Sequence, residues 1–426
     1  MRIFKAEPKQ NNPELTYSFR NGFGIRSLTD ARGIVHASTV KSSVKKRPCV
    51  YTVDDYDIDW LRSSIRPKSS NSTRKLTVGD VFCGAGIFSL GVEEACRAFN
   101  IHCEHIFGID FNKEAMEVYK ANFPKANHLL CDVLELIDGK FGQRPSTSEK
   151  EFLSRNGHVD ILIGGPPCQG HSDLNNRTRR DDPKNKLYSK MSRIAQLLDP
   201  KFVLIENVPG VIHDKHSIVQ KTATELSTLG YTISSGVVNL WEIGLPQKRK
   251  RFVLLATKKG TCEIPDILTV DPCGKRPLRW AIGDLINKYG FEDSIFNTSS
   301  THSQENQRRI AYLFAHKLYD LPNSQRPPCH KDKAHSYTAV YGRMNWNELS
   351  PTITGGFGST GQGRFVHPLK QRTLTPHEAA RVQFVPDFFR FPNVGRRALQ
   401  QIIGNAAPPK LSYTIILNSL MKGVFQ

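Results

Sequence analysis

Short apolar runs alternate with amphipathic segments between Lys75 and Thr257. The apolar runs have the length and composition of buried strands, and they are Val78–Phe82, Ile106–Ile109, Val159–Ile163, Phe202–Ile205 and Phe252–Ala256. The segments between them have helical spacing, at Ser89–Phe99, Lys113–Ala121, Leu187–Leu198 and Ser217–Leu229. This order predicts an α/β fold with a doubly wound, mostly parallel sheet, whose ligands bind at the carboxyl ends of the strands.

The pattern is weaker on both sides of this region. Residues 1–73 are basic and polar, and their loose helical spacing at 27–46 favours a partly ordered extension over a small helix-turn-helix. Residues 258–370 are rich in Pro, Asn, Gln, His and basic residues, which predicts a smaller domain of irregular loops. Helical patterning returns at Pro376–Phe384 and Ala398–Leu420. We therefore divide the chain into residues 1–73, 74–257, 258–370 and 371–426.

The composition adds a strongly positive charge, formally +19 over 426 residues. Such an excess of Lys and Arg attracts polyanions, most commonly DNA or RNA, although it also occurs on plain solubilising surfaces. No apolar run reaches the roughly 20 residues of a membrane span, and the polar start has no secretory apolar stretch. The nine cysteines include no Cys-x-x-Cys pair. We therefore expect a reduced, cytoplasmic protein without a zinc site or a disulfide framework.

Glycines and carboxylates follow the first strands at positions that suit a nucleotide-like cofactor. The first strand runs into Cys83-Gly84-Ala85-Gly86 before a helix, and glycines there let the backbone approach a ligand closely. Ser89 stands where a dinucleotide fingerprint has a third Gly, which disfavours a nicotinamide cofactor. Asp110 ends the next strand, where a carboxylate binds ribose hydroxyls, and Asp132 is placed to accept from an adenine amino group. The turn alone is weak evidence, but the two acids favour an adenosyl cofactor over a plain structural turn.

Cys168 has an unusual context, because Gly164-Gly165-Pro166-Pro167 comes directly before it. The prolines restrict the backbone and so aim the thiol. A polar loop with several arginines follows, and a nearby cation or helix terminus would favour the reactive thiolate. A buried structural Cys beside a tight turn is the alternative, and the flanking residues argue against it. Cys168 is therefore the candidate nucleophile.

Charged residues at later strands complete the candidate site. Glu206 ends the strand after Cys168, where its carboxyl group could protonate or hydrogen-bond a ring nitrogen; a surface salt bridge is the alternative. Arg249 and Arg251 alternate with lysines, so in an extended segment they would share one face and bind a phosphate or a carbonyl oxygen. A basic run of this kind is, by itself, more often a solvated edge strand.

Together these motifs resemble those of the bacterial-type DNA cytosine-5 methyltransferases. The blocks of that family occur in its order from about Lys75 onwards, as DVFCGAG, GIDFNKEA, CDV, GGPPCQGHS, ENV, QKRKR, LTPHEAARVQF and GNAAPP. The resemblance implies a Rossmann-like, S-adenosylmethionine-dependent methyltransferase fold. In that fold residues 74–257 and 371–426 form the catalytic domain, and residues 258–370 are a target-recognition domain that reads DNA.

The resemblance also implies a role for each motif. The residues that would hold S-adenosyl-L-methionine are Phe82, Gly84, Ala85, Gly86, Asp110, Phe111, Asp132, Val133, Pro167 and Asn405. Cys168 would attack carbon-6 of a cytosine, Glu206 would act at ring nitrogen 3, and the two arginines of the QKRKR block, Arg249 and Arg251, would complete the site. The target base would be flipped out of double-stranded DNA. The residues that would contact the DNA are Gln169, Arg177, Arg179, Arg180 and Arg381, the last of which would alternatively join the domains.

Some features depart from the family pattern or lie outside it. Ile87 stands where Gly is common, Asp110 where Glu is common and His377 where Arg is common, and residues 1–73 lie outside the resemblance. We further expect a monomer without a metal ion, associated with the nucleoid and not with a membrane. A cognate restriction endonuclease would be a functional partner, not a physical one.

Two other functions compete with this interpretation. An RNA cytosine-5 methyltransferase of the same fold would be expected to carry a Cys-Phe-Thr tripeptide in its second domain, and none is present. A non-catalytic DNA-binding regulator would be expected to have lost Cys168, Glu206 or an arginine of the QKRKR block, and all are present. The N-terminal extension could still add gene regulation as a second role.

Overall fold

The computed structural model describes residues 14–44, 50–167, 186–287, 294–328, 330–331, 340–392 and 394–425. The strands of its main sheet are β4 (Lys75–Val81), β5 (His102–Asp110), β6 (Asn127–Leu130), β7 (Ile161–Gly164), β8 (Phe202–Asn207), β9 (Thr232–Asn239) and β11 (Lys250–Thr257). Their order across the sheet is β6-β5-β4-β7-β8-β11-β9. The neighbours from β6 to β8 are parallel, and β11 is antiparallel to both of its neighbours. The predicted doubly wound, mostly parallel sheet is confirmed.

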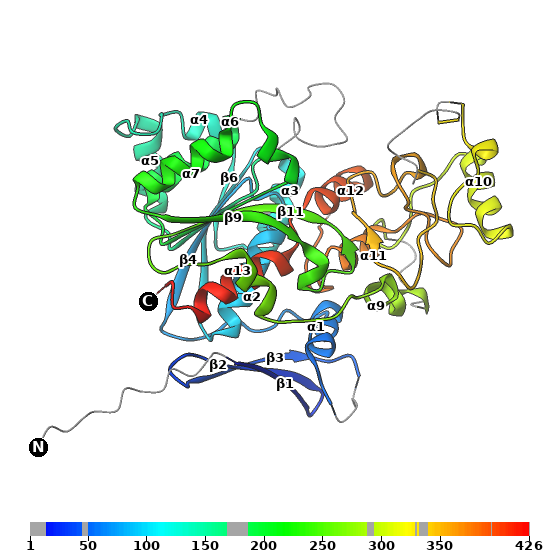
Figure 1. Ribbon diagram of the computed structural model, residues 1–426, viewed down its shortest axis with the longest axis horizontal. Coiled ribbons are helices and arrows are strands. Elements are labelled where there is room, and N and C mark those ends of the chain that lie inside the picture. Colours follow the sequence, from blue (N-terminus) through cyan, green and yellow to red (C-terminus); the bar gives the residue numbers. More distant parts are fainter. Residues whose placement is uncertain are drawn as a thin grey trace, which may run out of the picture.

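Helices cover both faces of the main sheet (Figure 1). On one face lie α2 (Ile87–Ala98), α3 (Lys113–Asn122) and α13 (Pro409–Met421), and on the other lie α5 (Thr147–Asn156), α6 (Lys186–Leu198) and α7 (Ile218–Thr228). Gly91 of α2 lets α13 approach closely, because a Cβ atom there would lie 1.9 Å from the Pro409 carbonyl oxygen. We call this sheet with its helices the large domain.

The C-terminal helical segment differs from the prediction. The stretch expected as one helix, Ala398–Leu420, contains two, α12 (Arg396–Asn405) and α13. The break falls at Pro408 and Pro409, because proline cannot continue a helix but is tolerated in its first turn. No helix in the described ranges is long and apolar enough to cross a membrane.

The N-terminal region is folded, and the predicted partly ordered arm with helical spacing is wrong for it. Residues 14–44 and 50–62, the N-terminal module, contain β1 (Glu14–Arg20), β2 (Phe23–Thr29), β3 (Val35–Lys41) and α1 (Val53–Arg62). The strands form an antiparallel sheet. Asn21 and Gly22 make the first turn with φ angles of 53° and 80°, as a two-residue hairpin requires. The module lies beneath α2 and α13 in Figure 1.

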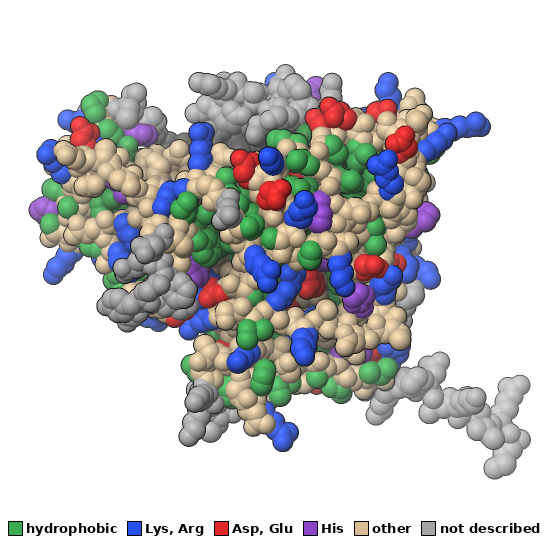
Figure 2. Space-filling model, turned by 180° about the vertical axis from the view of Figure 1, so that it is seen from behind, with side chains coloured by type: hydrophobic (Ala, Val, Ile, Leu, Met, Phe, Trp, Pro, Cys, Tyr) green, Lys and Arg blue, Asp and Glu red, His purple; other side chains and the backbone are tan. Residues whose placement is uncertain are grey.

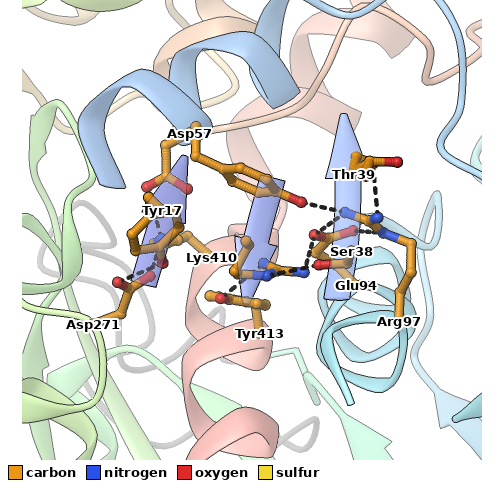
Figure 3. Close-up of polar contacts among 11 residues, drawn as sticks. Tyr17, Ser38, Thr39, Asp57, Glu94, Arg97, Asp271, Lys410 and Tyr413 are labelled. Atoms are coloured by element: carbon orange, nitrogen blue, oxygen red, sulfur yellow. Dashed lines mark hydrogen bonds and ion pairs between the residues drawn. The ribbon is translucent and has the colours of Figure 1, made fainter. Parts of the chain in front are cut away.

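Buried charges fasten this module to the large domain (Figure 3). Arg26 of β2 is only 2% exposed, and its guanidinium donates to the Glu94 carboxylate at 2.8 Å and to the Tyr413 hydroxyl at 2.9 Å. Glu94 also accepts from Arg97, which in turn donates to the hydroxyl of Tyr56 in α1 at 2.7 Å. Each buried charge therefore has an opposite charge beside it, as burial requires.

A second group of charges joins α1 to α13. Lys410 is buried, and its ammonium group lies 2.7 Å from the Asp57 carboxylate and 3.5 Å from that of Asp271. The Tyr17 hydroxyl of β1 donates to Asp271 at 2.8 Å. Burial acts to raise the pKa of the Asp57 carboxyl, but Lys410 and Arg276 outweigh it and hold that pKa below its ordinary value.

The remaining elements lie mainly in the irregular domain and its connections. They are α9 (Leu278–Ile282), α10 (Gln304–Ala315), α11 (Pro376–Val382) and the short parallel pair of β10 (Gln247–Lys248) with β12 (Ser350–Pro351). The domain has a small core of its own, formed by Ile310, Leu313, Leu321, Val340, Tyr341 and Val366. In contrast, α8 (Ile264–Thr269), which follows Lys258, buries Ile267 in the core of the large domain.

Candidate active site

The predicted site residues of the described chain, apart from Arg381, lie at one edge of the main sheet. The carboxyl ends of β6, β5, β4, β7 and β8 lie there, and the antiparallel β11 begins at the same edge, with Phe252 opposite Asn207. The chain reverses its direction across the sheet between β4 and β7, and such a switch point is where open α/β sheets bind ligands. The edge therefore has a half built on β4 to β6 and a half built on β7, β8 and β11.

The turn after β4 has a crowded side and an open side. Phe82, Gly84 and Gly86 have positive φ angles of 60°, 52° and 78°. A Cβ atom on Gly86 would come within 2.5 Å of the Phe123 ring, so glycine is required there. At Gly84 no atom of the described residues, its chain neighbours aside, lies within 4 Å of the Cβ position, so among these residues the backbone on that side is open to a ligand. Ala85, between them, is buried.

Asp110 is held against this turn. One carboxylate oxygen accepts from the Gly84 backbone N–H at 2.8 Å and the other from the Asn112 N–H at 2.8 Å. Burial raises the pKa of the Asp110 carboxyl. Because a carboxylate offers about four acceptor positions, it can still receive ligand hydroxyls. The neighbouring Phe111 is 68% exposed, and this apolar ring is free to pack on a ligand.

Asp132 lies one strand further along the edge, where it caps α4 (Val133–Leu136). One oxygen accepts from the Leu134 N–H at 2.9 Å, and the other has no partner among the residues that the structure describes. Val133 is buried beneath it. Four groups thus follow one another along this edge: the open backbone of Gly84, the Asp110 carboxylate, the exposed Phe111 ring and the free oxygen of Asp132. Together they fit the phosphate-free adenosyl group of S-adenosylmethionine.

Glu206 and Arg251 form an ion pair in the other half of the edge. Arg251 Nε lies 2.5 Å from Glu206 Oε1, and the side chains are 12% and 11% exposed. The second oxygen of Glu206 lies 3.5 Å from the position of a Cβ atom on Gly165, so the carboxylate faces the turn that leads to Cys168. The alternative of a surface salt bridge at Glu206 does not fit this burial.

Asn207 supports the same turn, and our sequence reasoning gave it no role. Its side-chain amide donates to the Pro166 carbonyl at 3.2 Å and accepts from the Val208 N–H at 2.8 Å. The sequence feature that could have indicated a role for Asn207 is its place in the Glu-Asn-Val block. Pro167, half-buried, ends the described part of the turn. Cys168, Gln169, Arg177, Arg179 and Arg180 lie outside the described residues, so their predicted roles stay predictions.

Arg249 does not share a face with Arg251, and that part of the prediction is wrong. It lies in the break between β10 and β11, where its backbone N–H donates to the Gln247 carbonyl at 3.0 Å. Its guanidinium is 1% exposed and donates to the carbonyl oxygens of Ile353 at 2.8 Å and Ala406 at 2.9 Å. Arg249 therefore holds the end of α12, where Asn405 is exposed, against the edge of the main sheet.

Two glutamines that sequence reasoning passed over extend this buried contact. The Gln247 amide donates to the side chain of Gln383 at 2.7 Å and accepts from the Ile353 N–H at 3.2 Å. Gln383 donates to the Ile403 carbonyl at 2.7 Å. Gln247 opens the QKRKR block and Gln383 stands in the LTPHEAARVQF block, and these positions were the available signals.

Arg381 joins the domains, and its predicted alternative contact with DNA is wrong. Its side chain is fully buried, so no surface of it is open to a phosphate. The guanidinium pairs with the carboxylate of Asp387 and lies 3.4 Å from that of Asp284. His377, which stands where the family commonly has Arg, lies 2.7 Å from the same Asp387 carboxylate.

The formal net charge of the chain is +19. On the face seen in Figure 2, Lys and Arg side chains lie over the domains without gathering in one patch. A net positive charge of this size attracts polyanions.

Comparisons with known proteins place the chain in one family. A family model described as C-5 cytosine-specific DNA methylase matches residues 76–420. The Type II methyltransferase M1.BsuMI of Bacillus subtilis is 47% identical over 365 residues, which cover 86% of this chain and 85% of that protein. The Type II methylase M.HgiDII of Herpetosiphon aurantiacus is 31% identical over 79% of this chain and 92% of its own length. A putative DNA modification methyltransferase encoded in an Escherichia coli prophage has the same fold, with a TM-score of 0.56 and 24% identity over 82% of this chain and 99% of that chain.

The sheet topology and the matching family model together define a Rossmann-like methyltransferase. The chain belongs to the C-5 cytosine-specific DNA methylase family, with Type II methyltransferases among its relatives, and it is a DNA cytosine-5-methyltransferase. The family predicted from the sequence motifs is confirmed.

Proposed function

We propose that the enzyme transfers a methyl group from S-adenosylmethionine to carbon-5 of a cytosine flipped out of double-stranded DNA, through a transient bond between Cys168 and carbon-6. The observation that carries this proposal is the Glu206–Arg251 ion pair beside Gly165, on the same edge as Gly84 and Asp110. S-adenosylmethionine, when bound, supplies an electrophilic methyl group.

The chain's own groups bind and orient the reactants. Asp110 accepts the ribose hydroxyls, the free oxygen of Asp132 accepts from the adenine amino group, and the Gly84 backbone and Phe111 pack against the adenosyl group. The other members of this pocket are Phe82, Ala85, Gly86, Val133, Pro167 and Asn405. Arg249 positions Asn405 by fixing the carbonyl groups on both sides of it, at Gly404 and Ala406.

The chemistry requires an activated ring, because carbon-5 of cytosine is a poor nucleophile. Addition of the Cys168 thiolate to carbon-6 makes the ring an enamine, and carbon-5 then accepts the methyl group. Glu206 hydrogen-bonds or protonates ring nitrogen 3, while Arg251 binds the ring carbonyl oxygen and orients Glu206. These charges are almost enclosed, so they stabilise the developing charge strongly. Loss of the carbon-5 proton and release of the thiolate restore the ring.

A stacked base cannot reach this edge, so the cytosine must leave the duplex at a cost of about a few kcal/mol. Residues 258–370 read the surrounding sequence in the major groove. Gln169, Arg177, Arg179 and Arg180 follow Cys168 in the chain and contact the opened duplex and its phosphates. The enzyme acts as a monomer, and a cognate restriction endonuclease is its functional partner.

Bisulfite sequencing of DNA from a methylation-free bacterial host that expresses the chain tests this function. Methylated cytosines in one short context are expected with the wild type and none with Cys168→Ala. Soluble wild-type protein that leaves the DNA unmethylated would contradict the proposal and direct the next assay to RNA.

A further inference from the structure

The irregular domain is connected to the large domain by two crossings of the chain. The entering crossing carries α9, and the returning crossing carries α11 and the turn that follows it at 384–388. α9 and α11 pack together, and Arg381 of α11 donates to the Ala281 carbonyl at 3.3 Å and pairs with Asp284. Movement of one domain against the other must therefore deform this pair of crossings.

The end of α1 contacts the entering crossing, as its position beside α9 in Figure 1 indicates. Arg62, the last residue of α1, places its Nε 3.2 Å from an Asp284 carboxylate oxygen and donates from Nη2 to the Trp280 carbonyl at 3.2 Å. The side chains of Arg62 and Asp284 are 25% and 21% exposed, so solvent screens this pair only in part.

The same end of α1 contacts the returning crossing. The Trp60 ring stacks on Phe384 with 5.8 Å between centroids and meets Phe388 edge-on at 5.5 Å. The Leu61 carbonyl accepts from the Asp387 N–H at 3.0 Å. Trp280 of α9 also stacks on Phe384, at 6.0 Å, so the Phe384 ring has aromatic neighbours from both α1 and α9.

α1 is itself fixed in place by buried charges. Asp57 lies 2.7 Å from Lys410 of α13 and 2.8 Å from Arg276, which precedes α9. Arg276 also pairs with Asp54 at 2.7 Å. A helix that is anchored to the large domain and contacts both crossings resists their deformation.

We propose that the N-terminal module is a clamp on the connection between the domains, and that Trp60 and Arg62 are positioning residues which set the target-recognition domain at the distance and angle needed to hold duplex DNA against the catalytic edge. This role rests on the proposed function of residues 258–370 in DNA recognition. It differs from gene regulation by the N-terminal region, because it serves the methylation reaction itself.

Arg62→Met tests the clamp, with Arg66→Met as a matched control. Arg66 lies four residues further on and makes an ion pair of similar exposure, 30% and 18%, with Glu93 of α2, away from both crossings. In the full-length enzyme we would measure KM for duplex DNA, KM for S-adenosylmethionine and kcat. Hydrogen exchange at 278–282 and 376–382 would report on the crossings without any need for activity.

The clamp predicts a KM for DNA raised about fivefold in Arg62→Met, the effect of losing one partly buried ion pair. Exchange should be faster in both helices, KM for the cofactor should stay unchanged, and Arg62→Lys should recover most of the DNA affinity. Equal effects of Arg62→Met and Arg66→Met, or unchanged exchange in Arg62→Met, would overturn the clamp. If the wild type methylated no DNA, the proposed function would fail, and the exchange comparison would still decide whether α1 restrains the crossings.

Discussion

Removing the Glu206–Arg251 ion pair one partner at a time tests whether these side chains act as a unit. We predict that Glu206→Gln and Arg251→Met each slow methyl transfer by about 10²- to 10³-fold, the usual effect of losing one preorganised group at a developing charge. The double variant should be slower than the worse single variant by less than about tenfold, because residues that act as a unit are not additive.

The geometry of the Glu206–Arg251 ion pair explains the expected size of these rate losses. The two groups lie 2.5 Å apart with side chains 12% and 11% exposed, so each is the main means of holding the other in a nearly enclosed site. Loss of either group leaves the remaining charge unpaired and misplaced, so loss of the second group then lowers the rate of methyl transfer only a little further. Independent contributions would instead multiply to about 10⁴- to 10⁶-fold.

The assay is single-turnover transfer of a labelled methyl group to unmethylated bacterial DNA, with enzyme and cofactor saturating so that weakened binding does not enter the rate. Lys250→Met is the matched control, since Lys250 is the exposed neighbour of Arg251 in β11, and its rate should equal that of the wild type. A double-variant loss equal to the product of the single losses would refute the reasoning. So would a wild-type rate in either single variant.

Two further variants test carboxylates at the cofactor turn. Asp80 accepts a 2.6 Å hydrogen bond from Ser89, and burial raises the pKa of its carboxyl from 3.8 to about 8. Because the pKa of the Asp80 carboxyl is higher in the folded state, its contribution to stability is complete below pH 3.8 and is lost as the pH rises through about 8. In this pH window, Asp80 should therefore lower the unfolding free energy of the wild type by up to about 1.4 kcal/mol for each pH unit, and Asp80→Asn should lack this dependence. Urea unfolding between pH 5 and pH 8 measures the dependence, and equal slopes for the two proteins would contradict the prediction. Asp110→Asn should weaken S-adenosylmethionine binding about 10- to 100-fold in calorimetry, since hydrogen bonds to a charged acceptor are lost, and an unchanged affinity would remove Asp110 from the pocket.

The hydrophobic pattern predicts the main sheet well where strands are buried on both faces. β7 and β8 are continuous apolar runs because helices cover both of their sides. β6 has only four residues, and β9 carries Ser234, Ser235 and Gly236 in a half-exposed position next to β11, so neither strand has a comparable signal. Tertiary pairing with an already formed neighbour, not local pattern, selects these strands.

The N-terminal module shows two different kinds of error. Asn21-Gly22 between alternating residues is a strong hairpin signal, and the prediction of a partly ordered extension made no use of it. The burial of Arg26 has no local signal at all, because its partners Glu94 and Tyr413 lie 68 and 387 residues away. A side chain that is usually exposed is buried here by charges that only the folded chain brings together.

The sequence predicts only those residues of the candidate site that lie in recognisable motifs. The strand-end positions of Asp110 and Glu206 follow from the alternation of strands and helices, whereas Asp132 follows β6, a strand that this pattern does not predict. The assignment of Arg249 failed because a period of two residues holds only in an uninterrupted strand, and the chain turns at this residue. The cause of the turn lies in the carbonyl groups of Ile353 and Ala406, more than a hundred residues further along the chain.

The partners of the N-terminal module also fix the order in which this protein can be assembled. During synthesis the hairpins of β1 to β3 can form as soon as they emerge, since such local structure needs microseconds. Arg26 and Asp57, however, meet Tyr413 and Lys410 only after 387 and 353 further residues. The module can meet Glu94 and Arg97 of α2 earlier, but its docking is complete only when α13 folds onto α2. A growing chain can complete its main sheet before α13 fastens the N-terminal module, so the contacts of α1 with the connection between the domains are secured last.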